Sequence, residues 1–337
     1  MAIAPRAATL LQRLGPIVAL LLLILVAWLI DKDGKFLTLR NFENILRQNA
    51  AVGVIALGMT FVIILGGIDL SVGSMAALLG GVGILAMNKA AAAGWSESTA
   101  ILAAVGVMLI GGPLLGAFNG LVITKGRITP FIATLGTMVI FRSLSLVFVD
   151  GGEYRSEVSG FAELASPRWM GDWARRFTAI LFFALAVVLG ILLKRTWFGT
   201  AVHAVGDNET AARYAGIKLD RVRIATYALS GLTCAIAAFI VSTRMNSIAS
   251  AQTGQLYELD AIAAVVVGGA SMRGGLGSIL GTVVGVLILG VVNNMLNMIS
   301  SSDTLKALGL EGVNIAHLQG LVKGAIIIAA VFVQRSR

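Results

Sequence analysis

At residues 66–74 the sequence reads Gly66-Gly67-Ile68-Asp69-Leu70-Ser71-Val72-Gly73-Ser74, a polar, glycine-rich interruption between two apolar runs. A carboxylate in such surroundings is unfavourable unless it is hydrogen-bonded, paired or in contact with water. Asp69 or Ser71 is suited to cap the N-terminus of a following helix, and glycine lets the chain turn where a side chain would clash. Two interpretations stay open: an ordinary capped connection, or the bend of a broken helix pair beside a transport pathway. Either one uses Gly66, Gly67, Asp69 and Ser71.

The composition of the chain predicts its environment. Of the 337 residues, 57% are hydrophobic and 13% are charged, and the mean hydropathy is +0.90. Soluble domains carry about a quarter charged residues, and a soluble core is too small to bury this much apolar surface. We therefore expect an all-α polytopic membrane protein, with residues 1–337 forming a single transmembrane domain. The single cysteine, Cys234, lies in an apolar run and is expected to be a small core residue.

The net charge of +9 is spread over short segments between the apolar runs. In a membrane protein this pattern is typical of cytoplasmic loops and of contact with anionic lipid headgroups. It does not favour nucleic acid as a partner. The basic residues Arg6 and Arg13, together with the basic segment 194–223, favour a cytoplasmic N-terminus.

About ten membrane helices are predicted, although several of the apolar segments are shorter than the ~20 residues needed to span a bilayer. An even number of spans places both termini on the same side. The expected helices cover about residues 17–30, 49–65, 75–87, 99–123, 129–149, 177–193, 224–242, 259–268, 276–299 and 318–333.

A second break is expected at residues 268–275, after the half-length apolar run 259–268. At an offset of 202 residues, Gly66, Gly67 and Gly73 coincide with Gly268, Gly269 and Gly275. Two broken helix pairs in corresponding places would point to a central pathway.

The segment 194–223 is predicted to be a basic loop that contains one short helix. Asp207 or Asn208 is its expected N-cap and Gly216 its C-terminal stop. Such a capped helix exceeds what a plain linker needs. We expect it to dock onto something in the cytoplasm.

Motifs for chemistry are missing from the sequence. It contains no nucleotide-binding P-loop, no metal-binding cluster and no nucleophile elbow, so no enzymatic activity, cofactor or metal is expected. Ionisable residues within apolar segments are few. Asp69 and Asp260 lie at helix ends, while Lys323 and Arg142 are each expected to reach a headgroup, pair with an acid or face a wet path. Energy for transport should come from a partner.

Several motifs in order resemble the bacterial permeases of the ribose/xylose/galactose type, which belong to ATP-binding-cassette importers. These are Gly66–Ser74, Thr129–Gly136, the loop 199–217, Glu258–Gly269 and Gly274–Thr282. The resemblance implies a dimeric inner-membrane permease that works by alternating access with a cytoplasmic ATPase and a periplasmic or lipid-anchored sugar-binding protein. It implies that loops 150–176 and 244–258 face the binding protein. It also implies that a helix seated in the ATPase is formed by Gly206, Asp207, Asn208, Glu209, Ala211, Ala212 and Gly216.

Asn119, Asn293 and Asn297 are expected either to offer polar contacts to a solute or to hold helices together, Asn293 and Asn297 sharing one helix face. The substrate stays open among pentoses, hexoses, inositols and related sugar derivatives. The rival hypotheses are a branched-chain amino acid permease, a self-sufficient secondary transporter or channel, and a membrane enzyme.

Overall fold

The computed structural model describes residues 5–31, 34–148, 152–300 and 315–335. These residues form helices joined by short connections, with one antiparallel pair of short strands in which Tyr154 is opposite Ile248. The elements are α1 (Pro5–Ile30), α2 (Leu39–Ile64), α3 (Val72–Ala92), α4 (Glu97–Gly126), α5 (Pro130–Val147), β1 (Glu153–Arg155), the 3₁₀ turns η1 (Ser159–Ala165) and η2 (Arg168–Arg176), α6 (Phe177–Arg195), α7 (Trp197–Asp207), α8 (Glu209–Tyr214), α9 (Leu219–Met245), β2 (Ser247–Ala249), α10 (Tyr257–Val267), α11 (Ile279–Ser300) and α13 (Ile315–Arg335).

Helices cover the ten apolar segments, but the expected count of ten spans is not confirmed. Within the described ranges, seven helices are long and apolar enough to cross a membrane: α2, α3, α4, α5, α6, α9 and α11. α1 also contains the apolar stretch Gly15–Ile30. α10 has 11 residues, as its half-length apolar run predicts. The mostly helical, polytopic fold class therefore stands, with fewer spans demonstrated than expected.

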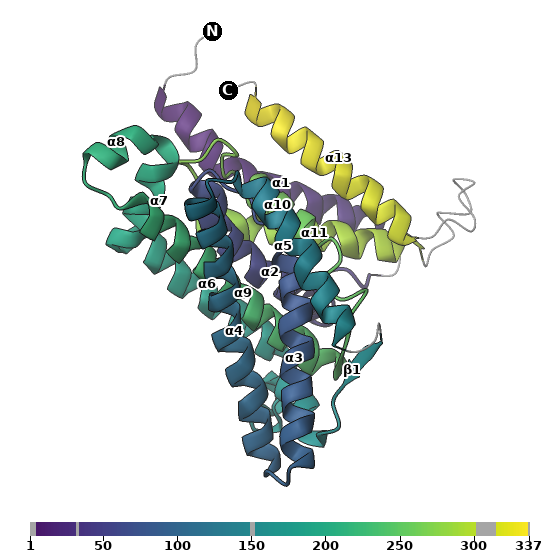
Figure 1. Cartoon of the computed structure of the whole chain (residues 1–337). Coiled ribbons are helices and arrows are strands. Elements are labelled where there is room, and N and C mark those ends of the chain that lie inside the picture. Colours follow the sequence, from purple (N-terminus) through teal and green to yellow (C-terminus); the bar gives the residue numbers. More distant parts are fainter. Residues whose placement is uncertain (1–4, 32–33, 149–151, 301–314, 336–337) are drawn as a thin grey trace.

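α2 is the central helix, in contact with α6, α9, α10 and α11. It begins at Leu39, well before the expected start near residue 49, because Thr38 caps it by accepting a hydrogen bond from the Asn41 N–H. A hydroxyl pair, Thr60 to Thr282 at 2.7 Å, joins α2 to α11 inside the bundle. Figure 1 shows α3 and α4 extending from this bundle to its lower tip.

Glycine allows α4 and α9 to cross at close range. A methyl group added at Gly112 or Gly116 of α4 would overlap the backbone of α9 at Gly231 or Tyr227. Small residues allow membrane helices to pack at this distance. α4 and α9 therefore form a fixed pair, with Cys234 fully buried in α9, as expected of a core residue.

The segments between the long helices differ from the expected surface loops. Tyr154, expected at a membrane interface with Trp169 and Trp173, is buried, and its hydroxyl donates to the Ser145 carbonyl at 3.2 Å. Burial raises the pKa of Tyr154 to about 12. Trp173 is exposed beneath the Arg176 guanidinium, and the side chain of Trp169 lies outside the described residues.

The stretch after α9 folds back along α3 instead of forming an open loop over residues 244–258. The Ile248 side chain packs where a methyl group on Gly80 would be, and the Gly254 carbonyl reaches the first turn of α3 at Gly73. The stretch 247–258 therefore lies beside α3 and within the body of the bundle.

Candidate functional site

The first helix break has the geometry of a Schellman cap. α2 ends at Ile64, Gly66 has a φ of 86°, its N–H donates to the Ile63 carbonyl, and the Gly67 N–H donates to the Val62 carbonyl, both at 2.9 Å. This backbone conformation favours glycine. The glycine-rich stretch therefore stops α2, and seven residues separate it from α3.

A buried polar group, here called the Asp69 cluster, fixes this break. Asp69 accepts hydrogen bonds from the Ser71 N–H (3.0 Å) and hydroxyl (2.6 Å) through Oδ1, and from the Ser230 hydroxyl (3.0 Å) through Oδ2. Asn119 donates to the Ser71 hydroxyl at 2.8 Å. All four side chains are fully buried. The cluster thus ties the break to α4 and α9.

The expected helix cap is divided between two residues. Ser71 occupies the N-cap position of α3, but its side chain makes no capping hydrogen bond to the helix. Asp69 accepts the Ser71 N–H instead. Asp69 therefore accepts an N–H group at the start of α3, as one of the two predicted alternatives has it. The prediction that the Ser71 side chain caps the helix is wrong.

The second break repeats the cap of the first. After α10, Gly269 has a φ of 94°, its N–H donates to the Val266 carbonyl at 2.9 Å, and the Ala270 N–H donates to the Val265 carbonyl at 3.1 Å. The two donor and two acceptor residues of this cap follow those of the first cap by 203 positions. The sequence overlay predicts an offset of 202. The break is also longer than residues 268–275, since α11 begins at Ile279.

Both breaks meet the end of α7 at a place that we call the junction, formed by Ile64, His203, Gly206, Gly274 and Gly275. The Gly275 N–H donates to the Ile64 carbonyl at 2.8 Å, and His203 Nδ1 lies 2.8 Å from the Gly275 carbonyl. A methyl group on Gly206 would overlap the Ile64 carbonyl. The end of α7 is therefore in direct contact with both breaks.

The segment 194–223 contains two helices, although the sequence predicts one. α7 was missed; its start is marked by Thr196, whose hydroxyl accepts from the Gly199 N–H at 3.3 Å. Asp207 ends α7 and is not the cap of the next helix. Asn208 is that cap, since its Oδ1 accepts from the Ala211 N–H at 2.9 Å.

α8 has the expected C-terminal stop. Gly216 has a φ of 82°, its N–H donates to the Arg213 carbonyl, and the Ile217 N–H donates to the Ala212 carbonyl. Ala212 is buried, while Tyr214 is 88% exposed. α8 therefore has one side packed on the protein and an open outer side, shown at the upper left in Figure 1.

Charge pairing holds α8 against the next long helix. Glu209 bridges Arg213 within α8 at 3.5 Å and Arg223 of α9 at 2.5 Å. Exposed ion pairs of this kind contribute little to stability. Their effect here is mainly on the orientation of α8 relative to α9.

Of the expected pathway asparagines, only Asn119 joins the first break. Asn293 and Asn297 lie towards the far end of α11, where their neighbour Asn294 pairs with Asn41 at 3.0 and 2.9 Å. Gln319 of α13 donates to Asn297 at 2.9 Å. For Asn297 this contact supports the helix-joining alternative, whereas the Oδ1 of Asn293 is buried without a hydrogen-bond partner among the described residues.

Pairing with an acid is confirmed for Lys323, whose ammonium lies 2.9 Å from Asp260. Arg142 instead donates to the carbonyls of Ser250 and Thr253, both at 2.8 Å. Sequence reasoning missed this use of Arg142 because the acceptors are backbone atoms about 110 residues away. Spacing along the chain carries no signal for such a contact.

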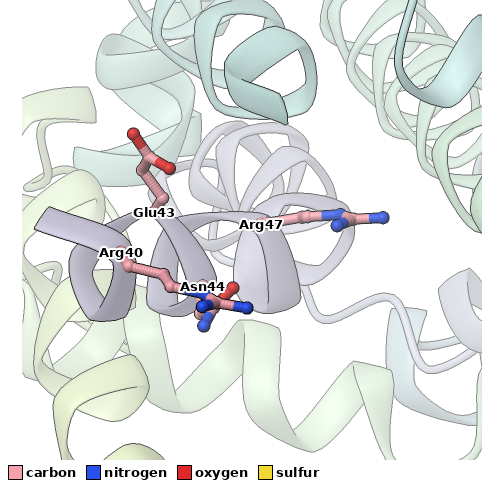
Figure 2. Close-up of a pocket in the computed structure, with 4 residues that line it drawn as sticks. All are labelled: Arg40, Glu43, Asn44 and Arg47. Atoms are coloured by element: carbon pink, nitrogen blue, oxygen red, sulfur yellow. The ribbon is translucent and has the colours of Figure 1, made fainter. Parts of the chain in front are cut away.

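A pocket of about 260 Å³ lies at the opposite end of α2 from the first break. Figure 2 shows its lining residues Arg40, Glu43, Asn44 and Arg47 along α2, with Glu43 directed away from Asn44. Glu43 pairs with Arg176 at 2.6 Å. This pocket is separate from the junction and the Asp69 cluster.

Comparison with known proteins finds one family and several relatives that span nearly the whole chain. A family model described as branched-chain amino acid transport system / permease component matches residues 41–331. The ribose import permease of Bacillus subtilis (strain 168) is 42% identical, covering 97% of this chain and 94% of the relative. The ribose import permease of Escherichia coli (strain K12) is 35% identical, covering 94% and 92%. The xylose transport system permease of the same strain is 32% identical, covering 94% and 90%.

Proposed function

The chain belongs to the family of branched-chain amino acid transport system permease components, and from this premise we propose that it is the membrane-spanning subunit of an ATP-driven importer of a simple sugar. One observation carries the sugar assignment: the relatives that align over nearly its whole length are ribose and xylose permeases. The proposed location is the bacterial inner membrane.

A partner ATPase supplies the energy in this proposal. α8 is the element that docks onto it, because it is capped at both ends, presents Tyr214 outward and is continuous with α7. α7 in turn contacts both breaks at the junction. ATP binding would push α8, and the junction would pass that movement to α2, α10 and α11.

The proposed orientation follows from the place of α8. Figure 1 shows the beginning of α1, the end of α13 and α8 at the same upper end of the molecule. If α8 meets a cytoplasmic ATPase, both of these helix ends are cytoplasmic. The opposite tip, where α3 leads into α4, then faces a periplasmic or lipid-anchored sugar-binding protein.

A second copy of the permease completes the proposed assembly. Alternating access needs two bodies that move against each other around a path. Charged side chains such as Asp260 and Lys323 are only partly buried within one copy. Because such groups are unfavourable against lipid, their location supports a homodimer that encloses them.

The test is uptake by proteoliposomes that contain this permease, its ATPase and its binding protein. We expect ATP-dependent uptake of labelled ribose or xylose that survives collapse of the proton and sodium gradients. Uptake of leucine in place of sugar would favour the branched-chain amino acid alternative. Uptake without the ATPase that is lost with the ion gradients would indicate a secondary transporter.

A further inference from the structure

Polar side chains gather where the chain enters α10, on a part of the molecule that the proposed function does not yet use. Gln252 and Gln255 are exposed, while Glu258 and Asp260 are partly buried. Exposed apolar residues lie between them: Leu256 is 58% exposed and Leu259 is 44% exposed. The polar group is here called the α10 entry site, and it consists of Arg142, Gln252, Gln255, Glu258, Asp260 and Lys323.

The α10 entry site lies at mid-depth in the bundle. Gly254 packs against Gly73 in the first turn of α3. Asp69, just before α3, binds Ser230, which lies roughly 16 Å from the beginning of α9 and roughly 22 Å from its end at 1.5 Å per residue. A bilayer's hydrocarbon core is about 30 Å thick. The start of α10 therefore lies beside the first turn of α3, at a level far from both ends of α9.

The backbone of residues 250–256 is largely non-helical at this depth. Irregular backbone inside a membrane occurs only where protein buries it or where it lines a water-filled cavity. The carbonyls of Ser250 and Thr253 are satisfied by Arg142, while the side chains of Gln252 and Gln255 are exposed. This arrangement matches the wall of a wet cavity.

The α10 entry site holds equal numbers of acidic and basic side chains. Lys323 pairs with Asp260 at 2.9 Å, with side-chain exposures of 23% and 18%. Glu258 and Arg142 carry the other two opposite charges of the site. With two acids and two bases, the site has no net charge to select an anion or a cation.

We propose that the α10 entry site binds an uncharged polyhydroxyl solute at mid-membrane on its way through the permease. This proposal rests on the proposed sugar importer. Each hydroxyl of such a solute both donates and accepts a hydrogen bond, and the amides of Gln252 and Gln255 can serve it in either role. The carboxylates of Glu258 and Asp260 accept from hydroxyls, Asp260 while it is still paired with Lys323.

The test is thiol protection in the purified permease, with ribose and xylose as the probes. Gln255→Cys places a thiol in the site, whereas the native Cys234 is fully buried and should not react. We expect either sugar to slow maleimide labelling at this position at least threefold. Gln48→Cys, an exposed glutamine replaced on α2, is the matched control and should label at the same rate with or without sugar. Gln252→Cys repeats the test if the first variant does not fold.

A second measurement separates this proposal from the proposed function. Gln252→Ala and Gln255→Ala should each raise the KM for sugar uptake about fivefold or more, with Gln48→Ala unchanged. Sugar uptake by the wild type without any sugar protection at positions 252 and 255 would overturn the α10 entry site and leave the importer intact. Failure of the wild type to import ribose or xylose, with protection by leucine instead, would overturn both.

Discussion

A single carboxylate, Asp69, explains how a polar stretch can interrupt two apolar helices without disordering them. Its two oxygens accept three hydrogen bonds, from the Ser71 N–H, the Ser71 hydroxyl and the Ser230 hydroxyl. Buried polar groups are tolerated when such partners are present and are costly when they are removed. The sequence predicted that Asp69 needs partners. It did not identify Ser230, because α9 lies about 160 residues further along the chain.

We predict that Asp69→Ala destabilises the permease by about 2 kcal/mol or more, because it leaves the Ser71 N–H and the Ser230 hydroxyl buried without their acceptor. Asp69→Asn should lose less than about 1 kcal/mol, since its amide oxygen still accepts from Ser71 and its NH₂ group can donate to Ser230. The thermal midpoint in detergent, followed by size-exclusion fluorescence, measures both. An equal drop in the thermal midpoint of the two variants would show that the charge itself is required, as in a proton relay.

At the scale of elements, caps were readable from the sequence and contacts between elements were not. Asn208 and Gly216 bound α8 as predicted, because a side-chain cap and a left-handed glycine are local features. α7 was overlooked, since its apolar, glycine-containing sequence lacks a strong stop before Asp207. Nothing in local sequence indicates that Gly206 would press against Ile64 and Gly275. This contact connects the end of α7, and through it α8, to both helix breaks, and it is the basis for proposing α8 as the coupling element.

The structure sharpens the docking prediction by separating the two sides of α8. Tyr214 and Ala211 face outward, so Tyr214→Ala and Ala211→Arg should weaken ATPase binding while the protein stays folded. Loss of a central interface aromatic typically costs about 2 kcal/mol, roughly 30-fold in affinity. Ala212 is buried, so a bulky side chain there should lower the thermal midpoint as well.

The measurement for α8 is the amount of ATPase that copurifies with each variant, together with sugar uptake. Trp95→Ala provides the matched control, because Trp95 is an exposed aromatic at the opposite tip, between α3 and α4. It should retain the ATPase fully. Normal copurification by both Tyr214→Ala and Ala211→Arg would remove α8 as the docking element.

On the scale of the whole molecule, the sequence predicted the fold class and the two breaks but not how they come together. Glycine runs marked both breaks closely, because the change from apolar helix to left-handed glycine is local. The number of spans stays a prediction, since an apolar run such as 259–268 has the same composition whether or not it crosses the membrane, and seven of the described helices are long and apolar enough to span. The packing of residues 247–258 along α3 could not be predicted either. A polar stretch between helices has the same composition whether it lies outside the membrane or inside it.

The arrangement of the ends gives a prediction for the whole molecule. α8 lies at the end opposite the tip that carries Trp95, so thiols introduced at these two places should lie on opposite sides of the membrane. In intact spheroplasts, a membrane-impermeant maleimide should label Trp95→Cys and leave Tyr214→Cys unlabelled until the membrane is opened. Cys234 is fully buried and should give no background. Labelling of Tyr214→Cys from outside would show that the orientation in the membrane is the reverse of the proposed one. α8 could then not meet an ATPase in the cytoplasm.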